Sequence, residues 1–153
     1  MKTVPAIAAA VAALDQATKA VALRAFADGG SVRVVPGYFD LRLVMNRGAA
    51  WGMLAGRRVL LVAVSAGMLA LLWANRRELA ATRCGRVAGG LLAGGIVGNL
   101  LDRAFRGEVV DFLDFHVRDV WAWPTFNVAD SAICAGVALL LVASFLPWFR
   151  ARR

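Results

Sequence analysis

Four long apolar stretches dominate the pattern of hydrophobic and polar positions along the chain. They run from Val4 to Phe26, from Val59 to Ala74, from Val87 to Leu101 and from Val128 to Phe149. With its flanking residues, each approaches the roughly 20 residues that a helix needs to cross ~30 Å of hydrocarbon. Because lipid leaves no backbone group unpaired, the pattern predicts four membrane-spanning helices. Their approximate bounds are 4–26, 58–75, 87–105 and 126–148.

The connections between these stretches are two long loops and a short one. Segments 27–57 and 106–125 join helices on one side of the predicted membrane, and segment 76–86 joins them on the other. In the first long loop, residues 31–35 and 38–45 partly alternate apolar with polar residues around a Pro-Gly pair. This alternation predicts a strand, a turn and a second strand. We therefore expect a small β-rich region at one face of the membrane.

The composition supports a membrane location. Apolar residues make up 60% of the chain before its 15 glycines are counted, whereas soluble domains reach roughly 45–50% with glycine included. Charged residues are 18% of the chain, and the mean hydropathy is +0.64. These values exclude a disordered chain, a collagen-like fibre and a disulfide scaffold. An integral membrane protein is the class that remains.

The net charge of +8 indicates which side of the membrane each loop occupies. Segments 1–3, 75–87 and 149–153 carry eight Lys or Arg in 21 residues, whereas segments 27–58 and 104–124 carry seven in 53 residues. Because Lys and Arg favour cytoplasmic loops, we expect both termini in the cytoplasm and the long loops outside. The arginines are scattered rather than gathered on one face, so a nucleic-acid partner is not expected.

The start of the chain has two interpretations. An alanine-rich apolar run follows Lys2, as in a cleavable signal peptide. The polar block DQATK at 15–19 interrupts that run before apolar residues resume, which favours an uncleaved first helix. The expected fold is therefore an all-α integral membrane protein, a single domain over 1–153. It has four transmembrane helices and a small β-rich extracytoplasmic loop region on the outer leaflet.

Polar residues of three predicted helices converge at one end of the bundle. Asp15 lies ~17 Å along the first helix, and Asn99 and Asp102 lie ~18–22 Å along the third, at 1.5 Å per residue. Asn127 and Asp130 lie at the start of the fourth helix. Because successive helices alternate in direction, we expect all five residues near the outer leaflet.

The aspartates in these helices need an explanation. An Asp within the membrane costs roughly 2.5–3.5 kcal/mol, and less near the interface. One explanation is local ion pairing of Asp15 with Lys19 and of Asp102 with Arg103. That explanation does not extend to Asp130, which has no basic residue within one helical turn.

A catalytic role is the other explanation. Asp111 and Asp114 lie in an apolar part of the second long loop, where burial would raise the pKa of a carboxyl group. Two carboxyl groups held close share one proton, so one can act as a base on water while the other donates to a carbonyl oxygen. From the residue types alone, the pair remains open among Asp102, Asp111, Asp114 and Asp130.

Glycines of the third predicted helix indicate how these groups come close. Gly90, Gly94 and Gly98 are spaced four residues apart, with Gly95 beside them. This spacing is typical of a smooth face for close helix packing in membranes.

Other chemistries fit less well. His116 has no Cys or His partner at ligand spacing, so neither a zinc site nor another cofactor is expected. Cys84 and Cys134 are predicted too far apart for a disulfide. Ser131 with Lys19 is an alternative nucleophilic pair.

Five sequence blocks resemble those of the lipoprotein signal peptidase (signal peptidase II) family. The blocks occur in the family's order from the first helix to the fourth. They are DQATK at 15–19, NRGAAWG at 46–52, GGIVGNLLDR at 94–103, VVDFLDF at 109–115 and FNVAD at 126–130. One departure is Trp51, where the family more often has Phe.

The resemblance implies an aspartyl endopeptidase of the bacterial cytoplasmic (inner) membrane, with Asp111 and Asp130 as the catalytic pair. Its substrates would be prolipoproteins carrying a diacylglyceryl group, cut just before the lipidated cysteine, and globomycin would inhibit it. We expect a monomer in contact with membrane lipid, with no metal or cofactor. The residues implied to shape the pocket or hold substrate are Asp15, Lys19, Asn46, Gly48, Asn99, Asp102, Arg103, Asn127 and Ala129.

Two non-enzymatic hypotheses compete with this one. A proton-coupled carrier would use Asp15, Asp102 and Asp130 as a relay. A structural membrane subunit would need the same residues only for assembly.

Overall fold

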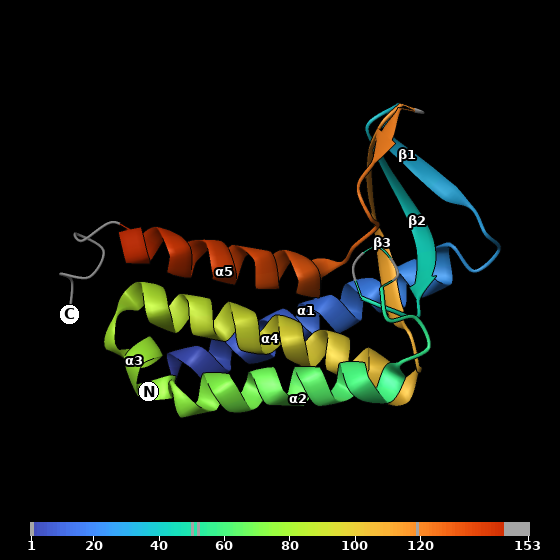
Figure 1. The fold of residues 1–153 in the computed structure, drawn as a ribbon. Helices are drawn as coiled ribbons and strands as arrows, with labels where there is room; N and C mark the ends of the chain where they lie inside the picture. Colours follow the sequence, from blue (N-terminus) through green and yellow to red (C-terminus); the bar gives the residue numbers. More distant parts are fainter. Residues whose placement is uncertain (1, 50, 52, 119, 146–153) are drawn as a thin grey trace.

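The computed structural model describes residues 2–49, 51, 53–118 and 120–145. Figure 1 shows the long helices lying side by side, with a sheet across one end of the bundle. The start of α1 and the end of α5 lie at the opposite end. The helices are α1 (Thr3–Ala25), α2 (Arg58–Ala74), α3 (Arg76–Ala81), α4 (Arg83–Phe105) and α5 (Val128–Phe145).

Three of these helices, α1, α4 and α5, are long and apolar enough to cross a membrane. The predicted long apolar helices beside a small sheet are therefore confirmed. The fourth helix, α2, has 17 residues, which gives ~25 Å at 1.5 Å per residue against a ~30 Å hydrocarbon core. The count of four spans therefore stays a prediction. The final three residues predicted for the last helix, 146–148, lie outside the described residues.

The central helix is α4, which packs against α1, α2 and α5. Its glycines make this packing close, as their spacing predicts. A Cβ on Gly98 would lie 2.5 Å from Oδ2 of Asp15 in α1. A Cβ on Gly95 would collide with the carbonyl oxygen of Ala129 in α5. Side chains at either position would push α1 or α5 away from α4.

The short loop predicted at 76–86 is mostly helical. The helix α3 occupies Arg76–Ala81, and α4 begins at Arg83, four residues before the predicted position 87. The side chain of Thr82 explains the early start, because its hydroxyl accepts the backbone N–H of Gly85 at 2.9 Å. Such a cap satisfies a helix N–H that has no partner within the helix.

The β-rich region is a four-stranded antiparallel sheet in the order β1-β2-β3-β4. The predicted hairpin is present, and its turn passes through Gly37, whose φ of +83° favours glycine. The second long loop supplies β3 and β4, which the sequence did not predict as strands. The bounds are β1 (Ser31–Val35), β2 (Phe39–Asn46), β3 (Val109–Val117) and β4 (Trp121–Ala122).

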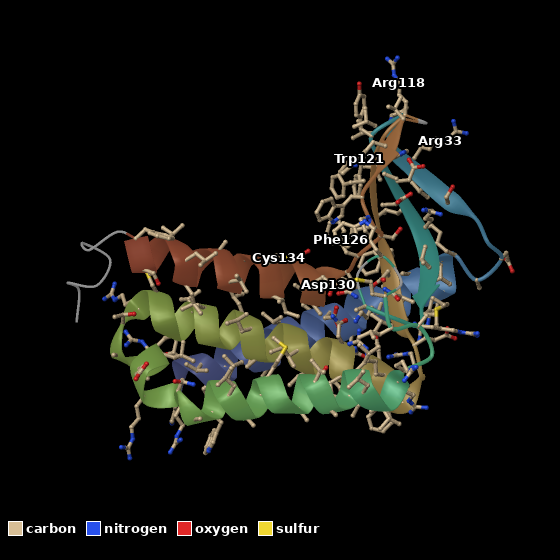
Figure 2. The ribbon with its side chains drawn as sticks, in the orientation of Figure 1. Arg33, Arg118, Trp121, Phe126, Asp130 and Cys134 are labelled. Carbon is tan, nitrogen blue, oxygen red and sulfur yellow. The ribbon has the colours of Figure 1, made fainter. Side chains whose placement is uncertain are left out.

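The sheet has an aromatic face toward the helices. Phe115 stacks on Phe39 at 4.4 Å and on Phe126 at 5.7 Å between ring centroids. In Figure 2, Trp121 and Phe126 lie on the side of the sheet next to α5. A buried cluster of Ala22, Phe26 and Phe112 joins the end of α1 to β3. These contacts fix β3 against the end of the helical bundle.

Candidate active site

A cavity of about 360 Å³ lies where β3, α4 and α5 meet. Asp111 on β3 and Asp130 in the first turn of α5 both line it. Figure 2 shows Asp130 at the end of α5 nearest the sheet. The loop after β2 contributes Asn46 and Trp51, and α4 contributes Arg103. Residues of β3, α4, α5 and the loop after β2 therefore enclose the two carboxyl groups.

Asp111 is almost completely buried, with 2% of its surface exposed. Its Oδ2 accepts from the side-chain amide of Asn46 at 2.9 Å, and its Oδ1 accepts from that of Asn127 at 2.7 Å. Burial raises the pKa of Asp111 to about 7, against the lowering effect of the Asn46 hydrogen bond and with a further rise from the charge of Asp130. The protonated form of this carboxyl group is therefore accessible near neutral pH.

Asp130 is held by two asparagines. Its Oδ1 accepts from the side-chain amide of Asn99 at 2.8 Å, and its Oδ2 accepts from the backbone N–H of Asn127 at 3.3 Å. In return, Oδ1 of Asn127 accepts the backbone N–H of Asp130 at 2.9 Å. This reciprocal arrangement is the one found in a capping box, so the same bonds begin α5 and orient the carboxyl group.

Asn127 connects the two carboxyl groups. Besides Asp111, its side-chain amide approaches Oδ1 of Asn99 at 3.1 Å and the carbonyl oxygen of Val110 at 3.3 Å. Asn127 is fully buried. The two aspartates are therefore held by one continuous network of amide groups.

Beneath this network lies a buried ion cluster. The ammonium group of Lys19 contacts Asp15 at 2.8 Å and Asp102 at 2.7 Å, and all three side chains are 0% exposed. The Asp15–Lys19 ion pair considered from the sequence is confirmed. The interpretation that Asp102 pairs with Arg103 is wrong. Asp102 faces α1 and pairs with Lys19, and it also pairs with Arg106 at the end of α4.

Arg103 instead faces the cavity and the loop after β2. Its Nη2 donates to the carbonyl oxygen of Gly48 at 3.2 Å, while the N–H of Gly48 donates to Oδ1 of Asn46 at 2.8 Å. Nε of Arg103 is buried without a hydrogen-bond partner among the described residues. The guanidinium group therefore has a donor available for a substrate oxygen.

Ala129 is buried and does not line the cavity described here. Its backbone N–H donates to Oδ1 of Asp15 at 2.9 Å. Its methyl group lies where a Cβ on Gly98 would be 3.2 Å away. A larger side chain at this position would separate α5 from α4.

The other sequence candidates have different partners. Asp114 pairs with Arg42 at 2.6 Å on the outer part of the sheet. The hydroxyl of Ser131 donates to the carbonyl oxygen of Asn127 at 3.0 Å, whereas Lys19 is surrounded by Asp15, Asp102 and Asn99. This geometry does not form the alternative Ser–Lys pair.

The sequence predicts neither a metal site at His116 nor a disulfide between the two cysteines. Cys84 and Cys134 are free thiols. Nε2 of His116 lies 3.8 Å from Oδ1 of Asp40. Over the described part of the chain, no three His, Cys, Asp or Glu side chains are grouped to hold a metal ion.

Two residues of the site were missed by the sequence analysis. The side-chain amide of Gln16 donates to Oδ1 of Asp102 and to the carbonyl oxygen of Gly98, both at 3.1 Å. Arg106 pairs with Asp102 and donates to Oε1 of Gln16 at 3.0 Å. The available signals were the place of Gln16 inside the DQATK block and the four-residue spacing from Asp102 to Arg106.

Comparison with known proteins gives a consistent result. The family model described as signal peptidase (SPase) II matches residues 7–146. A lipoprotein signal peptidase of Syntrophotalea carbinolica is 44% identical, over 94% of this chain and 91% of that protein. One of Geobacillus kaustophilus is 42% identical, over 91% of this chain and 90% of that protein.

Two solved structures share the fold. Both are described as a bacterial membrane enzyme. One has a TM-score of 0.83 and 33% identity, over 95% of this chain and 88% of that chain. The other has a TM-score of 0.78 and 32% identity, over 94% of this chain and 93% of that chain. Since the family model spans most of the chain and the relatives match it nearly end to end, the chain belongs to the signal peptidase II family and is an aspartic peptidase.

Proposed function

We propose that the chain removes the signal peptide from diacylglyceryl-modified prolipoproteins by cutting just before the lipidated cysteine, within the membrane. Asp111 and Asp130 are the catalytic pair in this proposal. The observation that carries it is their joint position in one cavity, each held by asparagine amides. Removal of signal peptides from prolipoproteins is the activity of the family to which the chain belongs.

The two carboxyl groups are not equivalent, which suggests a division of roles. The pKa of Asp111 is raised to about 7, chiefly by burial, so this group can hold a proton at neutral pH. Asp111 then donates its proton to the oxygen of the scissile carbonyl group. Asp130 takes a proton from water, and the water oxygen attacks the carbonyl carbon.

The second half of the reaction restores both groups. The tetrahedral intermediate collapses, the C–N bond breaks, and the proton held by Asp130 passes to the departing cysteine nitrogen. A hydroxyl proton of the intermediate returns to Asp111. The products are a signal peptide with a new carboxyl end and a lipidated cysteine with a free amine. Besides the substrate, the reaction consumes only one water molecule.

The rim of the cavity suits a lipidated substrate. Trp51 and Trp123 lie edge to face at 5.4 Å between ring centroids, and they are 66% and 45% exposed. Both line the cavity, and aromatic rings of this kind favour the membrane interface. The acyl chains can therefore stay in the bilayer while the peptide next to the cysteine reaches the two carboxyl groups.

The membrane orientation in this proposal follows from the distribution of positive charge. The sheet and the first turn of α5, which carry Asp111 and Asp130, lie at the end of the bundle away from the start of α1. With both termini in the cytoplasm, that end meets the outer leaflet of the bacterial inner membrane. Segments 27–57 and 106–125 are then the extracytoplasmic loops.

The test uses purified protein in lipid nanodiscs with a diacylated prolipoprotein, followed by product size on a gel. Asp111→Asn and Asp130→Asn should each abolish cleavage and leave the protein folded, with a cooperative melting transition. Asp114→Asn is the matched control, because Asp114 is a buried aspartate of the same strand. Cleavage by the wild type should stop when globomycin is added and should be absent for the unlipidated precursor.

Several outcomes would reject the proposal. Full activity of Asp111→Asn or Asp130→Asn would exclude the pair. Loss of activity in Ser131→Ala together with active Asp variants would favour the Ser–Lys alternative. Proton or solute flux in liposomes without any cleavage would favour a carrier, and altered assembly alone would favour a structural subunit.

A further inference from the structure

We propose that Asp15, Lys19 and Asp102 form a charged bridge that positions the two catalytic aspartates relative to each other through the backbone. They act as positioning residues and do not contact the substrate. This inference rests on the proposed catalytic pair. It assigns a specific task to three residues that otherwise count only as general support for the pocket.

The first half of the bridge holds the segment that carries Asp130. Oδ1 of Asp15 accepts the backbone N–H of Ala129 at 2.9 Å. Ala129 directly precedes Asp130 in the chain. Because Asp15 lies on α1 and Ala129 in the first turn of α5, this bond fixes where α5 begins against α1.

The second half of the bridge holds the segment that carries Asp111. Oδ2 of Asp102 accepts the backbone N–H of Val110 at 3.2 Å. Val110 directly precedes Asp111 and is fully buried. Each catalytic aspartate therefore follows a residue whose backbone N–H donates to a buried carboxylate of a different element, α1 for Ala129 and α4 for Val110.

Lys19 joins the two halves. Its ammonium group lies 2.8 Å from Oδ2 of Asp15 and 2.7 Å from Oδ2 of Asp102. Its third bond, at 3.0 Å, goes to Oδ1 of Asn99, whose amide group donates to Asp130. One ammonium group thus contacts Asp15 and Asp102, which anchor the two backbone segments, and is linked through Asn99 to the side chain of Asp130.

Positioning explains this cluster better than stability or substrate binding does. Buried ion pairs contribute little net stability, because desolvation offsets their attraction. Together with Arg106, the cluster holds two cations and two anions, so it carries no net charge to attract a ligand. None of Asp15, Lys19 and Asp102 lines the cavity that holds Asp111 and Asp130, or the neighbouring cavity between β2 and Pro124.

The first test measures the two backbone hydrogen bonds, those of Ala129 and Val110, directly. Protein with ¹⁵N-labelled valine and alanine is placed in nanodiscs, and the amide proton shifts of Val110 and Ala129 are followed by NMR. A hydrogen bond to a charged acceptor is stronger than one to a neutral acceptor. Asp15→Asn should therefore move the Ala129 amide proton upfield and leave Val110 nearly unchanged. Asp102→Asn should move the Val110 amide proton upfield and leave that of Ala129 nearly unchanged.

Two further variants complete this test. Lys19→Met should move both amide signals, because both anchors lose their shared partner. Asp114→Asn, the matched buried aspartate of β3, should move neither. If Lys19→Met does not fold, Asp15→Asn/Lys19→Met replaces it, since this double variant leaves the neutral Asp102–Arg106 pair.

The second test separates positioning from substrate contact. A displacement of about 1 Å at a reacting group costs about 100-fold in rate. Asp15→Asn and Asp102→Asn should lower kcat about 10- to 100-fold, as loss of residues that orient a reacting group typically does. KM for the diacylated substrate should stay within about twofold, in contrast to the effect of losing a binding contact.

The outcomes are distinguishable from those of the proposed function. If Asp111→Asn and Asp130→Asn are inactive but Asp15→Asn and Asp102→Asn raise KM at unchanged kcat, the bridge is a substrate contact and the positioning role is overturned. Amide signals that move together in every variant, or not at all, would also overturn it. Activity in Asp111→Asn would instead reject the catalytic pair itself.

Discussion

The side-chain amide of Asn127 lies 2.7 Å from Oδ1 of Asp111, while the backbone N–H of the same residue donates to Asp130. One residue therefore contacts both carboxyl groups and also caps α5. Asn127→Ala removes the amide and the cap together. We expect kcat to fall about 100-fold, because the carboxyl group of Asp111 loses an orienting bond and the first turn of α5, which carries Asp130, loses its cap. The lost cap should lower the free energy of unfolding by about 1 kcal/mol.

Kinetics and thermal melting check this prediction in the same nanodisc preparation. Asn75→Ala is a suitable control, since the side-chain amide of Asn75 also bonds a helix end, donating to the carbonyl oxygen of Leu71 in α2 at 2.8 Å, and it does so at the other end of the bundle. An Asn127→Ala variant with wild-type kcat would show that the amide network does not orient the proposed catalytic pair.

The raised pKa of Asp111 predicts a pH limit on activity. The proposed mechanism needs this group protonated, and its pKa is about 7. We therefore expect kcat to fall as pH rises through about 7, approaching a tenfold loss per pH unit above that value. A pH–rate profile from pH 5 to 9 with saturating substrate measures this fall in kcat. A rate that stays flat to pH 9 would mean that Asp111 does not donate the proton.

The same shift predicts a pH dependence of stability. A carboxyl group whose pKa is higher in the folded state binds more protons when folded, so stability falls as pH rises from the unfolded pKa to the folded one. For Asp111 this interval runs from 3.8 to about 7. Melting temperatures of the wild type should therefore decline across this range more steeply than those of Asp111→Asn. Parallel curves of melting temperature against pH for the two proteins would show that Asp111 does not cause the loss of stability.

Gly98 predicts how sensitive the ion cluster is to helix spacing. A methyl group on Gly98 would lie 2.5 Å from Oδ2 of Asp15, so Gly98→Ala must displace Asp15 or α1. We expect a loss of activity of about 10- to 100-fold, since Asp15 holds the segment before Asp130. Gly67→Ala is the matched control on α2, because no atom lies within 4 Å of its added methyl group. Improved helix propensity should stabilise that control by up to about 1 kcal/mol.

Much of this site could be predicted from helix direction alone. Asp15, Asn99 and Asp130 lie at heights along α1, α4 and α5 that the alternating directions bring together, and the structure joins them through Lys19 and Asn99. The close approach of α1 to α4 followed from the spacing of the glycines. These features depend on a regular rise per residue, which the sequence determines.

The position of Asp111 could not be predicted in this way. Its segment is a short apolar run, which periodicity does not assign to a strand or a helix. Its placement comes from pairing with β2, where Asp111 faces Val44 across the sheet. The partner of Asp102 was missed for a related reason, because adjacent residues on a helix point about 100° apart and Arg103 turns toward the cavity instead of α1.

Arg103 gives the prediction that contrasts most clearly with the ion cluster. Its Nε is buried and unpaired among the described residues, and the guanidinium lines the cavity with both aspartates. Substrate oxygens would satisfy that donor, so Arg103→Met should raise KM about tenfold, the equivalent of one lost hydrogen bond to a charged group. kcat should change less than in Asp15→Asn, and Arg103→Lys should recover part of the affinity. Substrate titration of the three variants measures the changes in KM and kcat separately. An unchanged KM in Arg103→Met would show that the arginine holds the loop at Gly48 rather than the substrate.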